Sequence, residues 1–575
     1  MIFRQIFLAT TVLFIFESCW LSFADQASAA NASAALQISA DKHYLNFPIK
    51  NDAPEREVLV SVSGKPMQKF SIRLAESKPD WWGTFSIVRW KGQPLTLSVT
   101  ALPAGSKALS QIDQTDKPKY PANLYHETLR PRFHYSVKQG WSNDVDGLVY
   151  YQGEYHLFYA FNPFGLDGLW NMSWGHAVSK DLVHWRELDP AIYPTLDGKI
   201  YSGSAVIDWK NTSGFGKAGV PPMVAIYTVT GDAYAQCISY SVDNGRTFTS
   251  YDDNPVVQNV IHGNRDPKVF RYEPLNKWVM AFFLGIPSDP GPDRKPRWSS
   301  IIRFMNSDDL KKWTPRGVVE SDPECPDLFP LPLDGDQHRI KWVLEAADGS
   351  YQVGSFDGGN FVSETPKRSS RFNAGYYYAA QTANELPKGD HRRIQMVWFR
   401  VPTPGMNFTQ AISVPLELTL HTTPDGPRLC SWPVHEVESL RTGLPLTIKD
   451  QPLIEGKDPL AEVKNGPLDI EMTIDPLDSK GFEFTIQGVP IRYNTRNHLL
   501  SCMNISTPVG LADGRVRFRV LSDVGTLEIF ADSGEKVIPQ LLSPTRPDPD
   551  RIGLRSLGGK PQIISLQVNR LNSIW

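Results

Sequence analysis

The sequence predicts an all-β protein with a propeller at its centre, and three observations support that prediction. Short alternating runs of apolar or aromatic residues recur along the chain, whereas helical periodicity is hard to find. The chain has 42 Gly and 46 Pro, which supply turns between such runs. A strand-turn-aromatic unit is also repeated in the middle of the chain.

The repeated unit reads "WGHAVSKDLVHW", "CISYSVDNGRTF" and "IIRFMNSDDLKKW". Ser179, Ser241 and Ser307 mark the same place in each copy, and an aromatic residue closes each copy. The spacing of roughly 60 residues exceeds the usual propeller blade but fits a four-stranded blade with long loops. Turns favour Ser and Asp in any case, so unrelated hairpins are the competing interpretation. The trailing aromatic favours the propeller.

The N-terminal segment, residues 1–29, has the pattern of a secretory signal peptide. Arg4 precedes an apolar run, 6–16, and small residues lead to an expected cleavage after Ala29. The run is too short to span a bilayer, and Glu17 leaves the boundary of the run open. We therefore expect an exported protein, secreted or periplasmic, without a membrane span.

Three β-rich blocks follow, as expected for a chain of 575 residues. Residues 36–115 predict a separate N-terminal β-domain with strands such as "REVLVSVSG" and "QPLTLSVTALP". Residues 125–420 hold the repeated units and form the expected propeller. Residues 421–575 contain runs such as "LDIEMTID" and "TLEIFAD", which predict a C-terminal β-sandwich.

Composition narrows the possible partners. A net charge of −3 gives no electrostatic argument for nucleic acid or an anionic membrane. The 16 Trp, 20 Tyr and 28 Phe suit sugar stacking, although aromatic residues also fill β-rich cores. The cysteines show no metal-ligand spacing. A disulfide between Cys430 and Cys502 is conceivable in an exported protein, but buried, reduced thiols are the favoured interpretation.

Three acidic motifs in the middle block are candidates for catalysis: "WSNDVDG" with Asp144, "GNRDPKVF" with Asp266 and "DPECPDLFPLP" with Glu324. Each lies near the expected start of a strand, and the innermost strands of a propeller converge on one axis. We therefore expect the three acids to meet in one funnel. Two carboxyl groups about 5 to 5.5 Å apart suit a retaining glycosidase, and like charges in a buried site raise one pKa. Taken singly, each motif is equally consistent with an ordinary turn.

The middle and C-terminal blocks resemble glycoside hydrolase family 32, the invertases, inulinases and levanases. Motifs that carry the resemblance include "RPRFHYSVKQGWSNDVDGLVYYQGEYHLFY", "YSGSAV", "NRDPKVF", "ECPDLFPL" and "GTLEIFADSG". The resemblance implies a five-bladed propeller followed by a β-sandwich. It also implies that Asp144 is the nucleophile, Asp266 the transition-state stabiliser and Glu324 the general acid/base.

The resemblance further implies substrate-binding roles at four positions. These positions are Asn143, Trp170, Ser202 and Arg265. Trp170 could instead be a core residue, and Ser202 could serve only to complete a turn.

The chain departs from the family pattern around these acids. Val145-Asp146 stands where Pro-Asn is usual, and we interpret Asp146 as a turn residue. Ala160 replaces a Gln, and Tyr376 stands at a position that is usually acidic. The pocket is therefore expected to be altered around intact catalytic acids.

These features predict an exported retaining β-fructosidase that acts on levan, inulin or sucrose without a metal or organic cofactor. Two alternatives stay open. A fructosyltransferase uses the same residues, and a non-catalytic carbohydrate-binding protein could keep the scaffold. The oligomeric state is left open.

Overall fold

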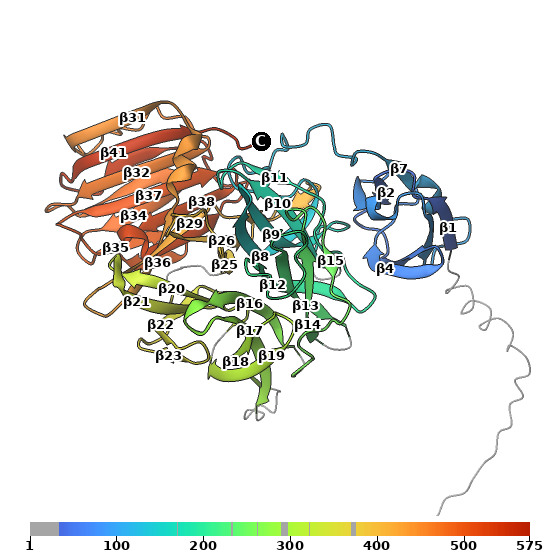
Figure 1. Ribbon diagram of the computed structural model, residues 1–575. Coiled ribbons are helices and arrows are strands. Elements are labelled where there is room, and N and C mark those ends of the chain that lie inside the picture. The colour runs from blue at the N-terminus through green and yellow to red at the C-terminus, as the bar shows by residue number, and fades with distance from the viewer. Residues whose placement is uncertain are drawn as a thin grey trace, which may run out of the picture.

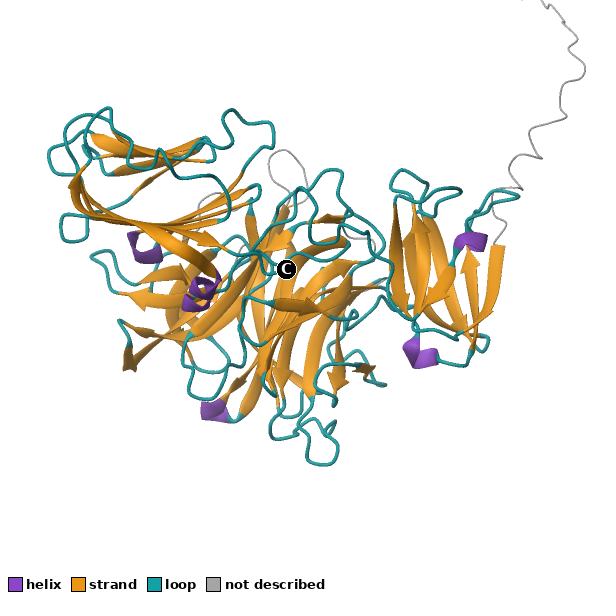
Figure 2. Ribbon diagram, turned by 90° about the horizontal axis from the view of Figure 1, so that it is seen from above, coloured by secondary structure: helices purple, strands orange, loops and turns teal. Residues whose placement is uncertain are grey.

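The computed structural model describes residues 34–168, 171–231, 234–261, 263–288, 297–320, 323–369 and 375–575. The expected signal peptide, residues 1–29, lies outside the described residues. Three β-units lie in a row, with the propeller between the N-terminal and C-terminal sandwiches (Figure 1). The helices of the described residues are short 3-10 helices of three to six residues, coloured purple in Figure 2. None of the helices in the described parts is long and apolar enough to cross a membrane.

The N-terminal unit is a two-layer β-sandwich. One sheet has the order β1 (Ala34–Ser39), β6 (Pro94–Val99), β3 (Arg56–Val62) and β4 (Lys65–Ile72). The other has the order β5 (Trp81–Ser86), β2 (Tyr44–Ile49) and β7 (Asp113–Thr115). Alternate residues of β3 and β5 are buried, as expected for strands with one face on a core. Strand β4 is an edge strand of this sheet.

The central unit is a propeller of five blades whose strands run outward from the axis in chain order. The first blade contains β8 (Gly140–Tyr151), β9 (Glu154–Asn162), β10 (Ser173–Ser179) and β11 (Trp185–Glu187). The second contains β12 (Lys199–Ile207), β13 (Met223–Thr230), β14 (Tyr234–Ser241) and β15 (Thr249–Ser250). The third contains β16 (Arg265–Tyr272), β17 (Lys277–Ser288), β18 (Arg297–Ser307) and β19 (Trp313–Glu320).

The fourth blade contains β20 (Asp327–Leu333), β21 (Asp336–Glu345), β22 (Ser350–Phe356) and β23 (Phe361–Ser363). The fifth contains β25 (Tyr377–Thr382), β26 (Arg393–Phe399), β29 (Leu416–His421) and β30 (Arg428–Pro433). Because β30 pairs with β29, the fifth blade continues to Pro433. The boundary expected after residue 420 therefore falls inside the blade rather than between two domains.

The repeated sequence unit is the connection between the third and fourth strands of a blade. Ser179, Ser241 and Ser307 are the last residues of β10, β14 and β18. Each hydroxyl donates to the carboxylate of the Asp two residues later, at 3.0, 2.7 and 3.1 Å. The prediction of a blade repeat from this motif is therefore confirmed. The motif could predict the repeat because the hydrogen bond that shapes each turn is local.

The ring is closed between the fifth and first blades. The short strand β27 (Phe408–Thr409) pairs in parallel with the start of β8. On the axis, the Gln381 amide donates to the carbonyls of Val145 at 3.3 Å and Gly203 at 2.7 Å. This side chain of β25 thus ties together the innermost strands of three blades and fixes where they begin.

The C-terminal unit packs a six-stranded sheet on a five-stranded one. The first sheet has the order β31 (Arg441–Pro452), β41 (Gln562–Leu571), β32 (Leu468–Asp475), β37 (Val516–Asp523), β38 (Thr526–Ala531), β39 (Lys536–Leu541). The second has the order β36 (Ile505–Pro508), β35 (Leu499–Cys502), β34 (Val489–Asn494), β33 (Gly481–Ile486), β40 (Gly553–Ser556). Cys430 and Cys502 are both free, as favoured from the sequence.

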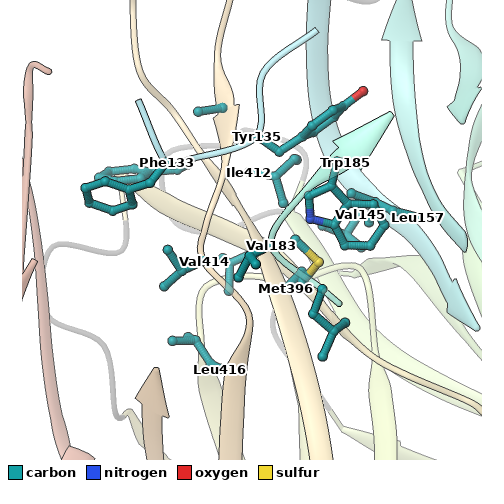
Figure 3. Packing of buried hydrophobic residues seen from close by; sticks show 14 of the residues in the cluster. Phe133, Tyr135, Val145, Leu157, Val183, Trp185, Met396, Ile412, Val414 and Leu416 are labelled. Atoms are coloured by element: carbon teal, nitrogen blue, oxygen red, sulfur yellow. The ribbon is translucent and has the colours of Figure 1, made fainter. Parts of the chain in front are cut away.

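One hydrophobic cluster joins the first blade, the fifth blade and the C-terminal sandwich. Figure 3 shows part of this cluster, which includes Val145 of β8, Trp185 of β11 and Met396 of the fifth blade. Leu521 and Phe530 of the sandwich belong to the same cluster. Val145 follows Asp144 directly, so the packing of this cluster helps to hold β8 where it presents that acid.

Candidate active site

A cavity of about 590 Å³ lies where the inner strands of the propeller begin. It brings together side chains from every blade, although these positions are widely separated in the sequence. The lining residues are Trp141, Asn143, Asp144, Gly168, Met172, Tyr201, Ser202, Tyr234, Arg265, Asp266, Glu324, Tyr378, Trp398 and Arg400. The expected convergence of Asp144, Asp266 and Glu324 is thus present in the geometry.

The inner strands are irregular at the residues that face this cavity. The ladder between β8 and β9 shifts register on either side of Val145, beside Asp144. The ladders of β12 and β16 shift at Ser202 and at Asp266, and that of β25 shifts just after Tyr378. A β-bulge bends a strand and changes where its side chains point. The bulges therefore turn these polar groups toward the common axis.

Asp144 is held by the second blade and by the loop before the fourth. The Ser202 hydroxyl donates to Oδ2 of Asp144 at 2.8 Å, and Sγ of Cys325 lies 3.7 Å from the same oxygen. Burial and the neighbouring Glu324 carboxyl raise the pKa of Asp144 to about 6. Below that pH the Asp144 side chain is therefore mainly a neutral carboxylic acid.

Asp266 is buried beside the same thiol, with 6% of its surface exposed. Its backbone is in the left-handed region, with φ of 60°, and its N–H donates to Oγ1 of Thr228 at 3.1 Å. The Cys325 backbone N–H and Sγ lie 3.3 and 3.4 Å from Oδ2 of Asp266. Burial and the carboxyl of Glu324 raise the pKa of Asp266 to about 7. A strained backbone with a perturbed acid is typical of a functional position.

Glu324 is oriented through both of its carboxyl oxygens. Arg265 donates to Oε2 from Nε at 2.8 Å and from Nη2 at 2.5 Å. Tyr378 donates its hydroxyl to Oε1 at 2.9 Å, and burial raises the pKa of this hydroxyl, which keeps it a donor. The Glu324 carboxyl is therefore fixed between the third and fifth blades, where it lines the cavity.

The interpretation of Asp146 as a turn residue was wrong. Residues 140–151 form one continuous strand, β8, and Asp146 is fully buried within it. Both of its carboxyl oxygens lack a hydrogen-bond partner within the described residues. Burial and the nearby Asp144 raise the pKa of Asp146 well above its usual range. The local sequence suggested a turn, but the bulged strand keeps its pairing with β9 instead.

The other predicted site residues fall in the same place or outside the described residues. Asn143, Ser202 and Arg265 line the cavity, and Asn143 is 6% exposed, with no hydrogen-bond partner for its Oδ1 among the described residues. Trp170 lies outside the described residues. Ala160 is 1% exposed, so the position where an amide was expected is now part of an apolar wall.

The sequence analysis missed the fifth-blade side of the cavity. Arg400 stacks over the rings of Tyr378 and Trp398, at 4.2 and 4.4 Å from their centroids. Tyr376, singled out from the motif, packs against the hydrophobic cluster, whereas Tyr378 reaches Glu324. The only sequence signal was the run of three tyrosines, and the bulge after Tyr378 decides which of them faces the site.

Comparison with known proteins agrees with this geometry. Residues 134–433 match the family described as glycosyl hydrolases family 32 N-terminal domain. The chain is 34% identical over 505 residues to a levanase of Bacillus subtilis (strain 168), covering 79% of this chain and 72% of the relative. It is 28% identical over 534 residues to an extracellular exo-inulinase of Aspergillus ficuum, covering 78% and 96%.

Among solved structures, the exo-inulinase from Aspergillus awamori is similar, with a TM-score of 0.68 and 25% identity. The similarity covers 78% of this chain and all of that one. The propeller, the convergent acids and these matches together make the protein a glycoside hydrolase. Within that class, the chain belongs to glycosyl hydrolase family 32.

Proposed function

We propose that this protein is an exported β-fructosidase that hydrolyses fructans or sucrose with retention of configuration. The observation that carries the proposal is the meeting of Asp144, Asp266 and Glu324 in one cavity of a family 32 chain. The relatives named levanase and exo-inulinase support a fructose-containing substrate.

The proposed reaction has two displacement steps. Glu324 protonates the glycosidic oxygen while Asp144 attacks C2 of the fructose unit, so the leaving sugar departs as an alcohol. Glu324, now a carboxylate, then removes a proton from water, which attacks C2 and frees Asp144 and fructose. Ser202 and Cys325 steady the attacking carboxylate, and Arg265 and Tyr378 orient Glu324.

Asp266 has the proposed role of transition-state stabiliser. Its carboxyl lies close to Arg265, with 3.6 Å between Oδ2 and Nε, and to the Cys325 thiol. A carboxylate beside the sugar ring can hydrogen-bond its hydroxyls and oppose the positive charge that develops at C2. The aromatic residues Trp141, Tyr201 and Trp398 supply faces for packing against sugar rings.

The direct test is to incubate the purified protein with levan, inulin and sucrose and to measure free fructose, with Asp144→Asn as the control. We expect fructose from at least one substrate and none above background from the variant. Binding of these sugars without release of fructose would instead support a non-catalytic carbohydrate-binding protein. Transfer of fructose to a second sugar, seen as longer products, would support the transferase.

The stereochemical part has its own test. NMR of the fructose anomer formed in the first minutes should show the configuration of the substrate. An inverted product would contradict Asp144 as the nucleophile, because a single displacement by water inverts the centre.

Export is proposed from the N-terminal pattern of residues 1–29 and from the extracellular relative. Expression of the full chain in a bacterial host, followed by mass spectrometry of the protein outside the cytoplasm, should give an N-terminus at Ala30. Recovery of only the uncleaved chain from the cytoplasm would contradict this part of the proposal.

A further inference from the structure

The described residues of the loop between β9 and β10, 163–168 and 171–172, contribute to one wall of the active-site cavity. Gly168 and Met172 of this loop line the cavity. Gly168 packs so closely on Trp141 that a Cβ atom there would come within 2.6 Å of the indole ring. The shape of this wall therefore depends on where the loop is held.

The main anchor of the loop lies in the core of a different domain. Phe164 is 1% exposed and belongs to the hydrophobic core of the N-terminal sandwich. Its ring stacks on Phe70 with 4.5 Å between centroids and meets Phe47 edge-on at 5.8 Å. Gly83 leaves room for it, since a Cβ at this position would come within 3.0 Å of the Phe164 ring. A propeller residue thus completes the N-terminal core.

The end of the loop is held by the edge strand β4. Oδ1 of the fully buried Asn171 accepts the Ser71 N–H at 2.7 Å, and its Nδ2 donates to the Ser71 carbonyl at 2.5 Å. The amide thereby occupies backbone groups that an edge strand otherwise leaves unpaired. Arg73 of the segment after β4 bonds Asp167 of the loop, with 3.1 Å from Nη1 to Oδ2.

A second segment, residues 189–194 after β11, also contacts the N-terminal sandwich. The Tyr193 ring meets Phe85 edge-on, with 4.7 Å between centroids. Gln68 of β4 donates its amide to the Pro194 carbonyl, and Tyr44 donates its hydroxyl to Asp189 at 3.0 Å. The N-terminal sandwich is thus docked at two points rather than tethered by its linker alone, and it lies on the side of the propeller away from the C-terminal sandwich (Figures 1 and 2).

We propose that the N-terminal sandwich is a positioning domain for the substrate cavity. It holds the cavity wall at Gly168 and Met172 through two positioning residues, Phe164 and Asn171. Residues 34–115 lie outside residues 134–433, the part of the chain that matches the family 32 N-terminal domain, whereas Phe164 and Asn171 lie inside it. The consequence for substrate binding rests on the function proposed above, whereas the anchoring itself does not.

The test compares Phe164→Ala with Leu97→Ala in the full chain. Leu97 is fully buried on β6 in the same core, so its truncation is a matched large-to-small change away from the loop. We expect faster amide hydrogen exchange at residues 163–168 in Phe164→Ala only. We also expect kcat/KM on the cleaved fructoside to fall by roughly 10- to 100-fold in this variant, mainly through KM, because a small misplacement of a substrate-binding wall weakens binding.

Phe164→Leu keeps a large apolar side chain in the N-terminal core, so its KM should stay close to that of the wild type. Asn171→Ala should raise KM in the same direction as Phe164→Ala. Wild-type exchange and wild-type KM in Phe164→Ala would overturn the proposal, and so would an equal rise in KM in Leu97→Ala. If the wild-type protein releases no fructose from any substrate, the proposed function fails, and the exchange rates still decide the anchoring.

Discussion

Two groups of buried acids in this molecule have opposite surroundings. At the junction between the propeller and the C-terminal sandwich, His134 lies between Asp523, at 2.9 Å from Nδ1, and Glu528, at 2.7 Å from Nε2. Asp523 also accepts the backbone N–H groups of Arg132 and Phe133, at 2.8 and 3.0 Å. These carboxylates have the partners that compensate for their loss of hydration.

Two acids of β8, Asp144 in the cavity and the buried Asp146 beside it, are much less well compensated. Asp146 has no hydrogen-bond partner in the described part of the chain, and Asp144 receives one hydroxyl and one thiol. Burial alone raises the pKa of Asp523, but the bond to His134 brings it below its usual range. Asp144 and Asp266 shift the other way, to about 6 and about 7. Paired acids stabilise the fold, whereas burying poorly compensated acids costs stability, and such perturbed acids are common at functional sites.

The largest effect is expected from replacing the acids proposed to act in catalysis, Asp144 and Glu324. Asp144→Asn should lower kcat by roughly 10⁴- to 10⁶-fold, because it removes the attacking group. Glu324→Gln should lose about 10²- to 10⁴-fold, the usual contribution of proton transfer. Steady-state rates on the cleaved fructan measure both.

An activated fructoside with a good leaving group separates the two roles. It needs little protonation, so it should partly restore formation of the glycosyl-enzyme in Glu324→Gln and not in Asp144→Asn. Equal rescue in both variants would show that the roles are assigned wrongly.

The next largest effect is expected from the paired acids around His134. Asp523→Ala leaves His134 and two buried N–H groups with fewer partners, so the free energy of unfolding should fall by about 3–5 kcal/mol. Denaturant titration measures the loss, and Asp478→Ala in an exposed turn of the C-terminal sandwich is the control. A change below about 1 kcal/mol would mean that the junction network is not stabilising.

The same network predicts how stability depends on pH. Burial lowers the pKa of His134, but Glu528 and Asp523 raise it to about 9, above the usual value of 6.5. The stabilisation from the charged imidazole is therefore complete below pH 6.5 and is lost as the pH rises through about 9. His134→Gln should remove this part of the pH dependence.

Replacing Asp144 should raise the free energy of unfolding, whereas replacing Asp523 should lower it. The folded-state pKa of Asp144 lies above the unfolded value of 3.8, so the folded protein binds more protons between pH 3.8 and about 6 and loses stability as the pH rises through this range. Asn carries no such charge, and Asp144→Asn should therefore be about 1–3 kcal/mol more stable than wild type above pH 7. The two proteins should unfold alike near pH 3.5, and a variant that is less stable at pH 8 would contradict the comparison.

The smallest effect adjusts one charge in the cavity. The Arg400 guanidinium helps to lower the pKa of Asp144, against the larger raising effects of burial and Glu324. Arg400→Met should therefore move the acid limb of kcat/KM from near pH 6 to higher pH, by up to about one unit. Lys449→Met, exposed on the C-terminal sandwich, is the control for net charge and should leave the limb in place.

The sequence predicted the parts of this molecule that depend on local signals. The Ser-x-Asp turns of the blades were predictable because each hydrogen bond spans two residues. The convergence of Asp144, Asp266 and Glu324 followed from a family resemblance together with the geometry of a propeller. The roles of these acids remain a proposal.

The rest depends on register and closure, which one sequence does not display. The burial of Asp146 follows from the bulges on either side of Val145 in β8, and a local pattern of Asp and Gly suggested a turn instead. Tyr378 and Arg400 reach the cavity only because the fifth blade closes against the first. The role of Phe164 was equally hidden, since its buried surroundings are supplied by residues about a hundred positions earlier in the chain.

The pairing of Phe408 with Gly140 also determines when the active site can exist. A ribosome makes the chain from the N-terminus, so β8 carries Asp144 while three more blades and the first two strands of the fifth are synthesised, before its neighbour β27 is available. Contacts of such long sequence separation form late and leave strand edges open in the meantime. The N-terminal sandwich, completed by Phe164 soon after β9, is available much earlier as a folded partner for the first blade. The active-site cavity therefore cannot be complete until the fifth blade has been synthesised.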